Sequence, residues 1–378
     1  MTNDFCRRTV LAGGLAATAS LALPRAAPAA AAPIYFGVSG PFTGNDAAYG
    51  AVWKNGMGMA VDEINAAGGI KGRPLKLLYE DTQADPRQAV PTAQLFVENP
   101  HVVAELGDFS SAASMAASPI YERGKLVQFG FTNSDPKFTK GGEYMFSTAP
   151  TMQMDAALMA DISMRTLRGK RAAVFYQDSD WGATSQKVFV PHFKALGGEV
   201  VALESYLLTD TDYHPILAKA LAAKPDVLVL FSYYTDGALL LQQAADVGLK
   251  GKIMAATSCY SNQFLKLGGE AVDGTVMSVL FFPADPRPDI QKFVKDYESR
   301  YHQAPDQYAA RAYDAVKILA WASAQGGPTR EGIRDALKDG TAIPSILFGD
   351  FRFDDERRVA HYQEELITVQ GGKFVHYA

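Results

Sequence analysis

Two clusters of hydroxyl side chains follow apolar runs that we predict to be β-strands. Ser110, Ser111 and Ser114 come after VVAEL, in the stretch GDFSSAAS, and Thr132 and Ser134 come after LVQFGF. A helix N-terminus presents unpaired N–H groups with partial positive charge, and hydroxyls beside it add further donors. The same residue types also serve as ordinary helix caps. The clusters therefore indicate one of two things. They form a binding site for a carboxylate or another small anion, or they only cap helices and bind no ligand.

Large aromatic side chains stand at the corresponding strand ends in the second half of the chain. Trp181 follows a strand in YQDSDWG, and Tyr233 and Tyr234 follow one in FSYYTDG. Rings at such positions commonly pack under a neighbouring loop. Three of them, set against hydroxyl clusters in the other half, favour a cleft with one apolar wall and one anion-binding wall.

Residues that could support catalysis or hold a metal are few. The six histidines are scattered, and we find no GxSxG elbow, no GxxxxGK loop and no GxGxxG after the first strand. Asp178, Asp180 and Asp236 cluster at strand ends and could act as general acid or base, but such residues are more often helix caps or partners of a cationic ligand group. We expect no catalytic residue, no metal and no cofactor, and hence a binding protein instead of an enzyme.

These side chains need elements that bring strand ends together. From Ile34 onward short β-rich runs alternate with amphipathic helical stretches, a second such series starts at Arg171, and a predicted helix over 151–167 connects the two series. This alternation is typical of parallel sheets with helices on both faces. The sequence predicts an α/β fold with two doubly wound parallel-sheet lobes joined by several crossing strands. In such lobes ligands bind at the carboxyl ends of the strands.

The expected boundaries of the lobes follow from where each series begins and ends. We expect lobe 1 to contain residues 32–150 and 281–348, and lobe 2 to contain residues 151–280 and 349–378. The late β-rich runs FGDFRF and YQEELITVQ are too fragmentary to fold alone. We expect them to complete the two sheets by crossing back and forth between the lobes.

The amino end has the pattern of an export signal. Residues 1–31 hold the basic pair Arg7 and Arg8, then an apolar stretch, then an Ala-rich end with small residues of the kind that a signal peptidase cleaves. The pair followed by TVL is similar to a twin-arginine signal, with a general secretory signal as the alternative. Cys6 precedes the apolar stretch, which is the wrong place for a lipid-anchored cysteine. We expect a cleaved signal and a mature chain that is free in the periplasm, without stable membrane insertion.

Charge and cysteine content narrow the classes of partner. The chain of 378 residues has a formal net charge of −5 and no dense Lys/Arg block, so it lacks the basic surface that a nucleic-acid binder needs. Once the signal is removed Cys259 is the one cysteine left, so no internal disulfide can form. We expect a monomer that binds a small molecule and no nucleic acid.

Several longer stretches resemble one known family. SGPFTGNDAAYG, MAVDEINAAGGIKGRPL, YEDTQADPRQAV, GDFSSAAS and PDVLVLFSYYTDGALLLQQAADVGLK are similar to segments of the periplasmic substrate-binding proteins of branched-chain amino acid ABC importers, and the resemblance runs from about Pro33 to about Phe353. It implies the type I periplasmic-binding-protein fold and a membrane permease as partner. It also implies that Ser111, Thr132 and Ser134 hold the carboxylate of the ligand.

The resemblance further places the aromatic positions of the family's ligand cleft on Tyr49, Trp181 and Tyr233. In the family a glutamate in the loop after the MAAT strand binds the ligand's ammonium group. This chain has Thr257 or Ser258 there instead. A buried ammonium without an anionic partner is costly, so this departure bears directly on the ligand.

The departure leaves two alternatives. Either another acid binds the ammonium, with Asp108, Asp180 and Asp236 as candidates, or the ligand has no ammonium. Phe109 and Tyr260 add further rings near the predicted site, which makes an aromatic carboxylate the second alternative. The candidate ligand-binding residues are Tyr49, Phe109, Ser110, Ser111, Thr132, Ser134, Trp181, Tyr233, Asp236, Thr257 and Tyr260.

One function and two alternatives follow from the sequence. We expect the periplasmic solute-binding component of an ABC importer, which captures a branched-chain or aromatic amino acid by hinge closure and delivers it to the permease. The first alternative is the same role for an aromatic or other non-amino carboxylate. The second is a ligand-sensing module that reports to a receptor.

Overall fold

The computed structural model describes residues 31–378, of which residues 32–378 form one compact unit. The predicted export signal, residues 1–31, lies outside the described residues except for Ala31. Two separate sheets organise the compact unit, and we call the parts built on them lobe 1 and lobe 2.

Lobe 1 is built on a five-stranded sheet in the order β2-β1-β3-β4-β5, and all of its strand pairs are parallel. Its strands are β1 (Ile34–Gly40), β2 (Leu75–Asp81), β3 (Val102–Leu106), β4 (Val127–Gly130) and β5 (Met145–Ser147). The helices that connect these strands are α1 (Ala47–Ala66), α2 (Pro86–Glu98) and α3 (Ser111–Arg123).

Lobe 2 is built on a seven-stranded sheet in the order β12-β11-β10-β9-β8-β6-β7. Strands β6 to β10 pair in parallel, whereas β11 and β12 add an antiparallel edge. The strands are β6 (Arg171–Gln177), β7 (Glu199–Tyr206), β8 (Val227–Phe231), β9 (Lys252–Ala255), β10 (Thr275–Val279), β11 (Glu365–Gln370) and β12 (Lys373–His376). The helices are α4 (Met152–Asp161), α5 (Asp180–Ala195), α6 (His214–Ala223), α7 (Tyr234–Asp246) and α8 (Asn262–Gly268).

The parallel part of each sheet has the same strand order. In lobe 1 the first strand, β1, lies between β2 and β3, and in lobe 2 the corresponding strand β6 lies between β7 and β8. At such a position the connections leave toward opposite faces of the sheet, and a crevice opens beyond the carboxyl ends of the two central strands. The topology therefore predicts a ligand site next to Gly40 and Leu106 in lobe 1, and next to Gln177 and Phe231 in lobe 2.

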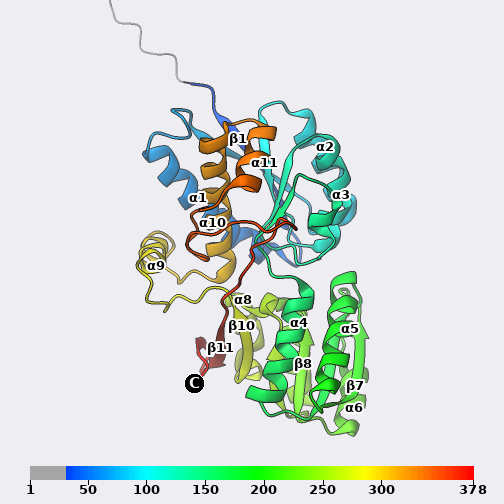
Figure 1. The fold of residues 1–378 in the computed structure, drawn as a ribbon. Coiled ribbons are helices and arrows are strands. Elements are labelled where there is room, and N and C mark those ends of the chain that lie inside the picture. The colour runs from blue at the N-terminus through cyan, green and yellow to red at the C-terminus, as the bar shows by residue number, and fades with distance from the viewer. Residues whose placement is uncertain (1–30) are drawn as a thin grey trace, which may run out of the picture. The chain divides into compact units, whose positions relative to one another are not determined.

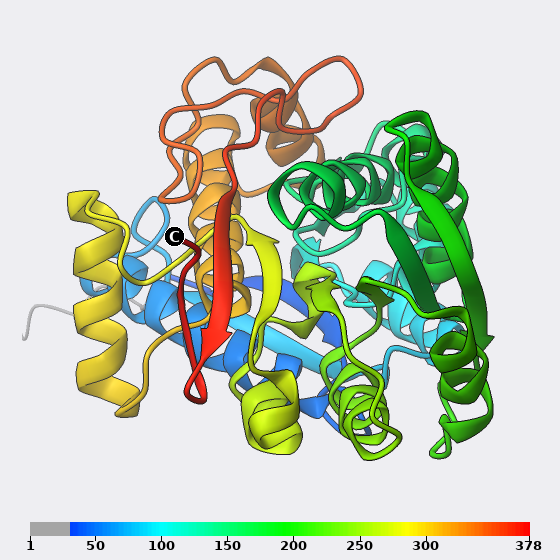
Figure 2. The same cartoon turned by 90° about the horizontal axis from the view of Figure 1, so that it is seen from below.

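Helices cover both faces of these sheets (Figures 1 and 2). Strand β6 shows why, because its residues point alternately to two different apolar clusters. Ala172 and Val174 pack into the cluster that contains residues of α4 and α5, while Ala173 and Phe175 pack into the cluster that contains residues of α7 and α8. A strand that is apolar on both sides must be covered on both sides.

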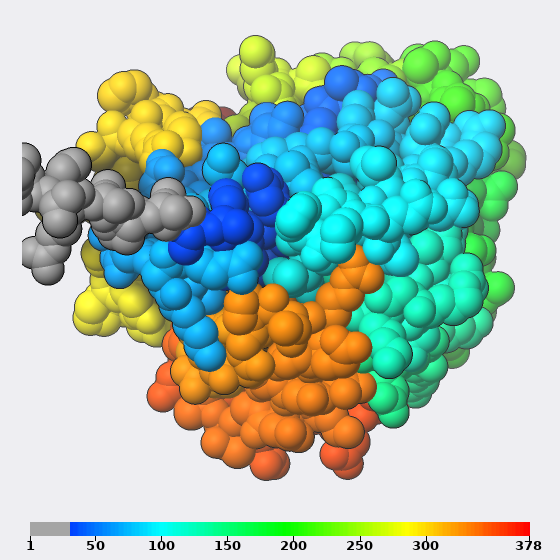
Figure 3. All heavy atoms as spheres, turned by 90° about the horizontal axis from the view of Figure 1, so that it is seen from above, coloured from blue at the N-terminus to red at the C-terminus, as the bar shows by residue number. Residues whose placement is uncertain are grey.

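Three later helices return to lobe 1: α9 (Pro288–Tyr301), α10 (Gln307–Gly326) and α11 (Arg330–Asp339). Helix α10 packs closely along α1, and a Cβ atom on Gly56 would lie only 2.1 Å from the carbonyl oxygen of Ala309. Glycine is therefore required at this contact, which sets the position of the first turn of α10. In Figure 3 the surface of the helices around residues 310–340 adjoins that of the first hundred described residues.

The chain crosses between the lobes three times: between β5 and α4, between β10 and α9, and before β11. The last crossing follows a segment that stays on lobe 1. There Phe353 packs edge-on against Phe129 and Phe146, and Arg358 donates hydrogen bonds to Ser147 and Ala149. The lobe boundaries stay a prediction, and these contacts favour a last boundary after Arg358 over the predicted one between residues 348 and 349.

No helix within residues 31–378 is both long enough and apolar enough to span a membrane.

Candidate functional site

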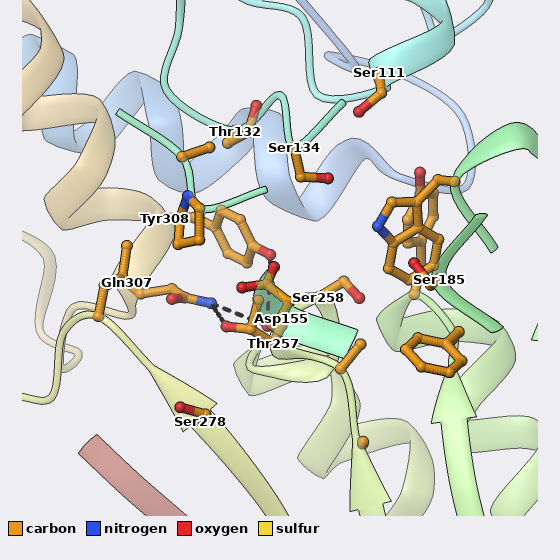
Figure 4. Close-up of a pocket in the computed structure, with 18 of the residues that line it drawn as sticks. Ser111, Thr132, Ser134, Asp155, Ser185, Thr257, Ser258, Ser278, Gln307 and Tyr308 are labelled. Carbon is orange, nitrogen blue, oxygen red and sulfur yellow. Dashed lines mark hydrogen bonds between the residues drawn. The ribbon is translucent and has the colours of Figure 1, made fainter. Parts of the chain in front are cut away.

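A cavity lies between the two lobes, at the carboxyl ends of their strands (Figure 4). Its free interior is about 70 Å³, which corresponds to roughly five to seven water-sized positions. This is room for a small molecule. The residues that line it are Phe109, Ser111, Thr132, Ser134, Ala149, Pro150, Asp155, Met159, Trp181, Ser185, Phe231, Tyr233, Ala255, Ala256, Thr257, Ser258, Ser278, Leu280, Gln307, Tyr308, Arg311 and Glu364.

Four helices begin beside the cavity, and each has a polar cap that the local sequence supplies. Ser110 accepts a hydrogen bond from the N–H of Ala113 at the start of α3, and Thr151 and Ser179 play the same role for α4 and α5. At α10 the Asp306 carboxylate accepts from two backbone N–H groups. These caps fix the helix starts that carry Ser111, Asp155 and Arg311.

The hydroxyl wall of the cavity comes from lobe 1 and consists of Ser111, Thr132 and Ser134 (Figure 4). The Thr132 hydroxyl donates to the carbonyl oxygen of Asp108 at 3.0 Å. The hydroxyls of Ser111 and Ser134, in contrast, have no hydrogen-bond partner within residues 31–378. Both are therefore free to donate to a bound anion at the N-terminus of α3.

The turn before this wall depends on a glycine. Gly107 has a φ of +148°, and a Cβ atom there would lie 2.2 Å from the backbone oxygen of Ser39. The next residue, Asp108, is buried and accepts a hydrogen bond from the Thr82 hydroxyl. Burial raises the pKa of Asp108 to about 6. The close approach of the two strand ends thus places α3, and with it Ser111, at the edge of the cavity.

The aromatic wall combines both lobes. The ring centroid of Tyr233 lies 5.1 Å from that of Phe109 and 5.4 Å from that of Trp181. Tyr49 stacks behind Phe109 at 3.8 Å between centroids and does not line the cavity. Tyr49 supports Phe109 from the core of lobe 1, because its ring is almost completely buried.

Hydrogen bonds join the two lobes next to the cavity. The Tyr49 hydroxyl donates to the Ser258 carbonyl at 2.5 Å, and the Tyr234 hydroxyl donates to the Asn45 carbonyl at 2.6 Å. The side-chain amide of Gln307 donates to the Thr257 carbonyl at 3.0 Å and also to its hydroxyl (Figure 4). Thr257, which with Ser258 is one of the two residues at the place where the family resemblance puts a glutamate, is therefore hydrogen-bonded to lobe 1.

Seven predicted site residues line this cavity: Phe109, Ser111, Thr132, Ser134, Trp181, Tyr233 and Thr257. The other four do not. Besides Tyr49, Ser110 caps α3, and Asp236 accepts hydrogen bonds from Gln177 at 2.9 Å and from Tyr206. Tyr260 is buried against Phe374 in lobe 2.

None of the acids predicted as ammonium partners lines the cavity. Asp108 and Asp236 are buried, and both accept the hydrogen bonds described above. Asp180 is exposed at the start of α5. The acids that do line it are Asp155, in the first turn of α4, and Glu364, immediately before β11. The sequence reasoning did not consider either residue, because one lies inside a helix and the other in the last crossing segment.

A single arginine accompanies these two acids. Arg311 lies in the second turn of α10, where only 5 % of its surface is exposed. Arg311 belongs to the stretch YAARAYDAV, and the sequence patterns above did not single it out. A charged side chain within a largely apolar helix was a usable signal, because arginine is rarely fully buried without a partner.

Burial dominates the electrostatics at this end of the cavity. It raises the pKa of Asp155 well above the ordinary value, the neighbouring Glu364 raises it further, and Arg311 opposes both effects. Burial also raises the pKa of Glu364, which accepts a hydrogen bond from Ser278. A positively charged ligand group between the two acids would return both to their ionised form.

Within residues 31–378 no group of three or more His, Cys, Asp or Glu side chains is arranged to hold a metal ion.

Comparisons with known proteins agree with this architecture. A family model described as periplasmic binding protein matches residues 33–373. A Leu/Ile/Val-binding protein homolog of Brucella abortus is 28% identical over 333 residues, which are 85% of this chain and 86% of the relative.

Two solved structures extend the comparison. One is a putative branched-chain amino acid ABC transporter protein from Rhodospirillum rubrum, which is 32% identical with a TM-score of 0.67 and covers 91% of this chain and 100% of its own. The other is a branched-chain amino acid transporter substrate-binding protein of Streptococcus pneumoniae in complex with isoleucine, which is 25% identical with a TM-score of 0.85 and covers 90% and 97%. The predicted α/β fold with parallel sheets in two lobes is confirmed, and so is the family resemblance.

Proposed function

The chain belongs to the periplasmic binding protein family, and we propose that it is the solute-binding component of an ABC importer whose ligand is an α-amino acid. The ligand occupies the cavity between the lobes, and the loaded protein delivers it to a membrane permease. The family and the predicted export signal both support a periplasmic location for the mature chain. We propose that it acts there as a monomer.

One observation carries the proposal. The cavity presents free hydroxyl donors of Ser111 and Ser134 on one wall and the carboxyl group of Asp155 on another. Donors beside a helix N-terminus stabilise a carboxylate, and a buried carboxylate stabilises an ammonium. An α-amino acid carries both groups, so it satisfies both walls at once. Asp155 thereby takes the role that Thr257 and Ser258 cannot fill.

Capture follows from the way the lobes meet. An open form receives the ligand carboxylate on lobe 1, and closure then brings Asp155, Trp181 and Tyr233 of lobe 2 against the rest of the ligand. The hydrogen bonds from Tyr49 to Ser258 and from Tyr234 to Asn45 are contacts of this closed form. Micromolar affinity corresponds to about −8 kcal/mol, which two charged-group contacts and one ring contact can supply.

The experiment that tests the proposal compares matched pairs of ligands. Isothermal titration calorimetry of the mature chain with leucine and 4-methylpentanoate, and with phenylalanine and 3-phenylpropanoate, varies only the amino group. The amino acid of at least one pair should bind, and its deaminated partner should lose most of the affinity. Tighter binding of the deaminated acids would contradict an amino acid ligand.

A second candidate ligand is an aromatic carboxylate without an amino group. It is favoured by the rings of Phe109, Trp181, Phe231 and Tyr233, which line one side of the cavity. In this case Asp155 and Glu364 would stay protonated, since burial raises the pKa of both. Adding 4-hydroxybenzoate to the same titrations separates this candidate from the first.

A further inference from the structure

Arg311 lines the cavity and lacks any acceptor for its charge among the described residues. Its side chain is buried, and its Nε and Nη2 atoms are completely enclosed without a hydrogen-bond partner. No hydrogen bond or ion pair joins its guanidinium group to another part of residues 31–378. Five N–H donors on a buried cation are expensive to leave unpaired, so a partner from outside the fold is expected.

Arg358, which is buried, and Arg330, which is half-buried, show the contrast. Arg358 is equally buried, and both of its terminal nitrogens donate to protein oxygens, among them Ser147 Oγ at 3.1 Å and the Ala149 carbonyl at 3.0 Å. Arg330 donates to the backbone oxygens of Gly124 and Val97 at 2.8 and 2.9 Å. These two arginines hold backbone segments together, whereas Arg311 holds none.

A second unpaired group lies on the same helix face. Gln307 precedes Arg311 by four residues on α10, which places both side chains on one face of the helix. The Gln307 amide nitrogen donates a hydrogen bond to Thr257, so the amide oxygen Oε1 faces away from Thr257. This oxygen is buried and has no hydrogen-bond donor. The α10 face thus carries unpaired donors and an unpaired acceptor beside the cavity.

The groups opposite Arg311 come from the other lobe. Asp155 and Glu364 influence it electrostatically, but neither comes within ion-pair distance of it. The Tyr308 ring lies 5.9 Å from the guanidinium carbon. Arg311, Asp155 and Glu364 line the same cavity, so a ligand in it can contact both Arg311 and the acids.

We infer that Arg311 receives a carbonyl-type oxygen at the far end of the ligand, so that the ligand is an amino acid whose side chain ends in a carboxamide or a carboxylate. This inference rests on the proposed function. The planar guanidinium donates parallel N–H groups that match such an oxygen or oxygen pair. A carboxamide also donates its N–H to Gln307 Oε1, and a carboxylate accepts from a protonated Glu364. An aliphatic side chain would leave the Arg311 guanidinium group and Gln307 Oε1 unpaired.

The test uses side chains of similar length with different ends. Calorimetry of the mature wild-type chain should show glutamine or glutamate binding at least tenfold more tightly than methionine. In Arg311→Met this preference should disappear, because the affinity for glutamine and glutamate falls while that for methionine changes less than about threefold. The stronger of glutamine and glutamate identifies the terminal group.

A second variant guards against a folding defect. Arg311→Lys keeps the charge but not the planar fork, and it should retain the thermal unfolding midpoint of the wild type while losing most of the preference. Two results would overturn the inference: methionine or leucine binding the wild type as tightly as glutamine, or an equal loss for every amino acid in Arg311→Met. If no amino acid bound the wild type, the proposed amino acid ligand would itself be wrong. The titrations with the deaminated acids detect that case separately.

Discussion

The two polar regions of the cavity are built in opposite ways. The hydroxyl wall consists of the neutral side chains of Ser111, Thr132 and Ser134, which follow the ends of β3 and β4. The charged region consists of Asp155, Arg311 and Glu364, which come from α4, α10 and the last crossing segment. One region is assembled by a single sheet, and the other exists only where the two lobes meet.

The two regions also differ in how they affect the stability of the protein without ligand. An unpaired hydroxyl at the edge of a cavity is easily satisfied by water, so the hydroxyl wall costs the empty protein little. A buried guanidinium without an acceptor and two buried carboxyl groups with raised pKa values cost much more. The charged region therefore contributes least to the stability of the protein without ligand. We expect it to govern which ligand is bound.

The largest effect is expected at Asp155. Asp155→Asn should lower the affinity for the amino acid ligand at least about 30-fold, because removing one partner of a buried charge pair costs about 2–5 kcal/mol. Titration calorimetry measures the loss. Asp180→Asn is the matched control, since Asp180 is an exposed acid that was also predicted to bind the ammonium. Unchanged binding in Asp155→Asn would mean that the hydroxyl wall alone selects the ligand.

A smaller effect is expected at the hydroxyl wall. Ser111→Ala should weaken binding about tenfold, since a hydrogen bond to a charged group contributes about 1.5–3 kcal/mol. Ser110→Ala, one residue earlier, removes the cap of α3 and should lower stability by about 1 kcal/mol without a comparable loss of affinity. If the two variants bind equally well, Ser111 does not contact the ligand.

The aromatic wall should contribute less again. Of the three tryptophans, Trp181 is the one that lines the cavity. Ligand binding should therefore change the intrinsic fluorescence, and Trp181→Phe should abolish most of that change while lowering the affinity only several-fold. A fluorescence change that persists in Trp181→Phe would show that the signal comes from a core tryptophan.

The smallest effect concerns the pH dependence of the unfolding midpoint, which reports on a buried acid beside the hydroxyl wall. Burial raises the pKa of Asp108, beside the hydroxyl wall, from 3.8 to about 6. The folded state thus holds this proton more tightly than the unfolded chain, and stability is lost as the pH rises from about 4 through 6. The unfolding midpoint without ligand should fall by a few degrees between pH 5 and 7.5. Asp108→Asn should reduce this dependence, and an unchanged slope would assign it to other buried acids.

Much of the fold could be predicted from local patterns. Alternating β-rich and helical runs indicated two parallel-sheet lobes, and the predicted helix over 151–167 corresponds to α4 and the turn Ile162–Thr166 that follows it. The last crossing was harder to place. FGDFRF was expected to complete a sheet, but Phe353 instead packs on the rings of lobe 1, a contact between residues far apart in the sequence.

By itself the sequence placed the hydroxyl wall at the strand ends of lobe 1 and Trp181 and Tyr233 at the strand ends of lobe 2, because residues directly after parallel strands meet at one edge of their sheet. The tertiary structure alone decided that Asp155, Arg311 and Glu364 share a cavity. Each of them lies in a helix or a crossing segment, where sequence spacing carries no information about the opposite lobe. Their meeting depends on the close approach of α10 to α1 at Gly56 and on the path of the chain into β11.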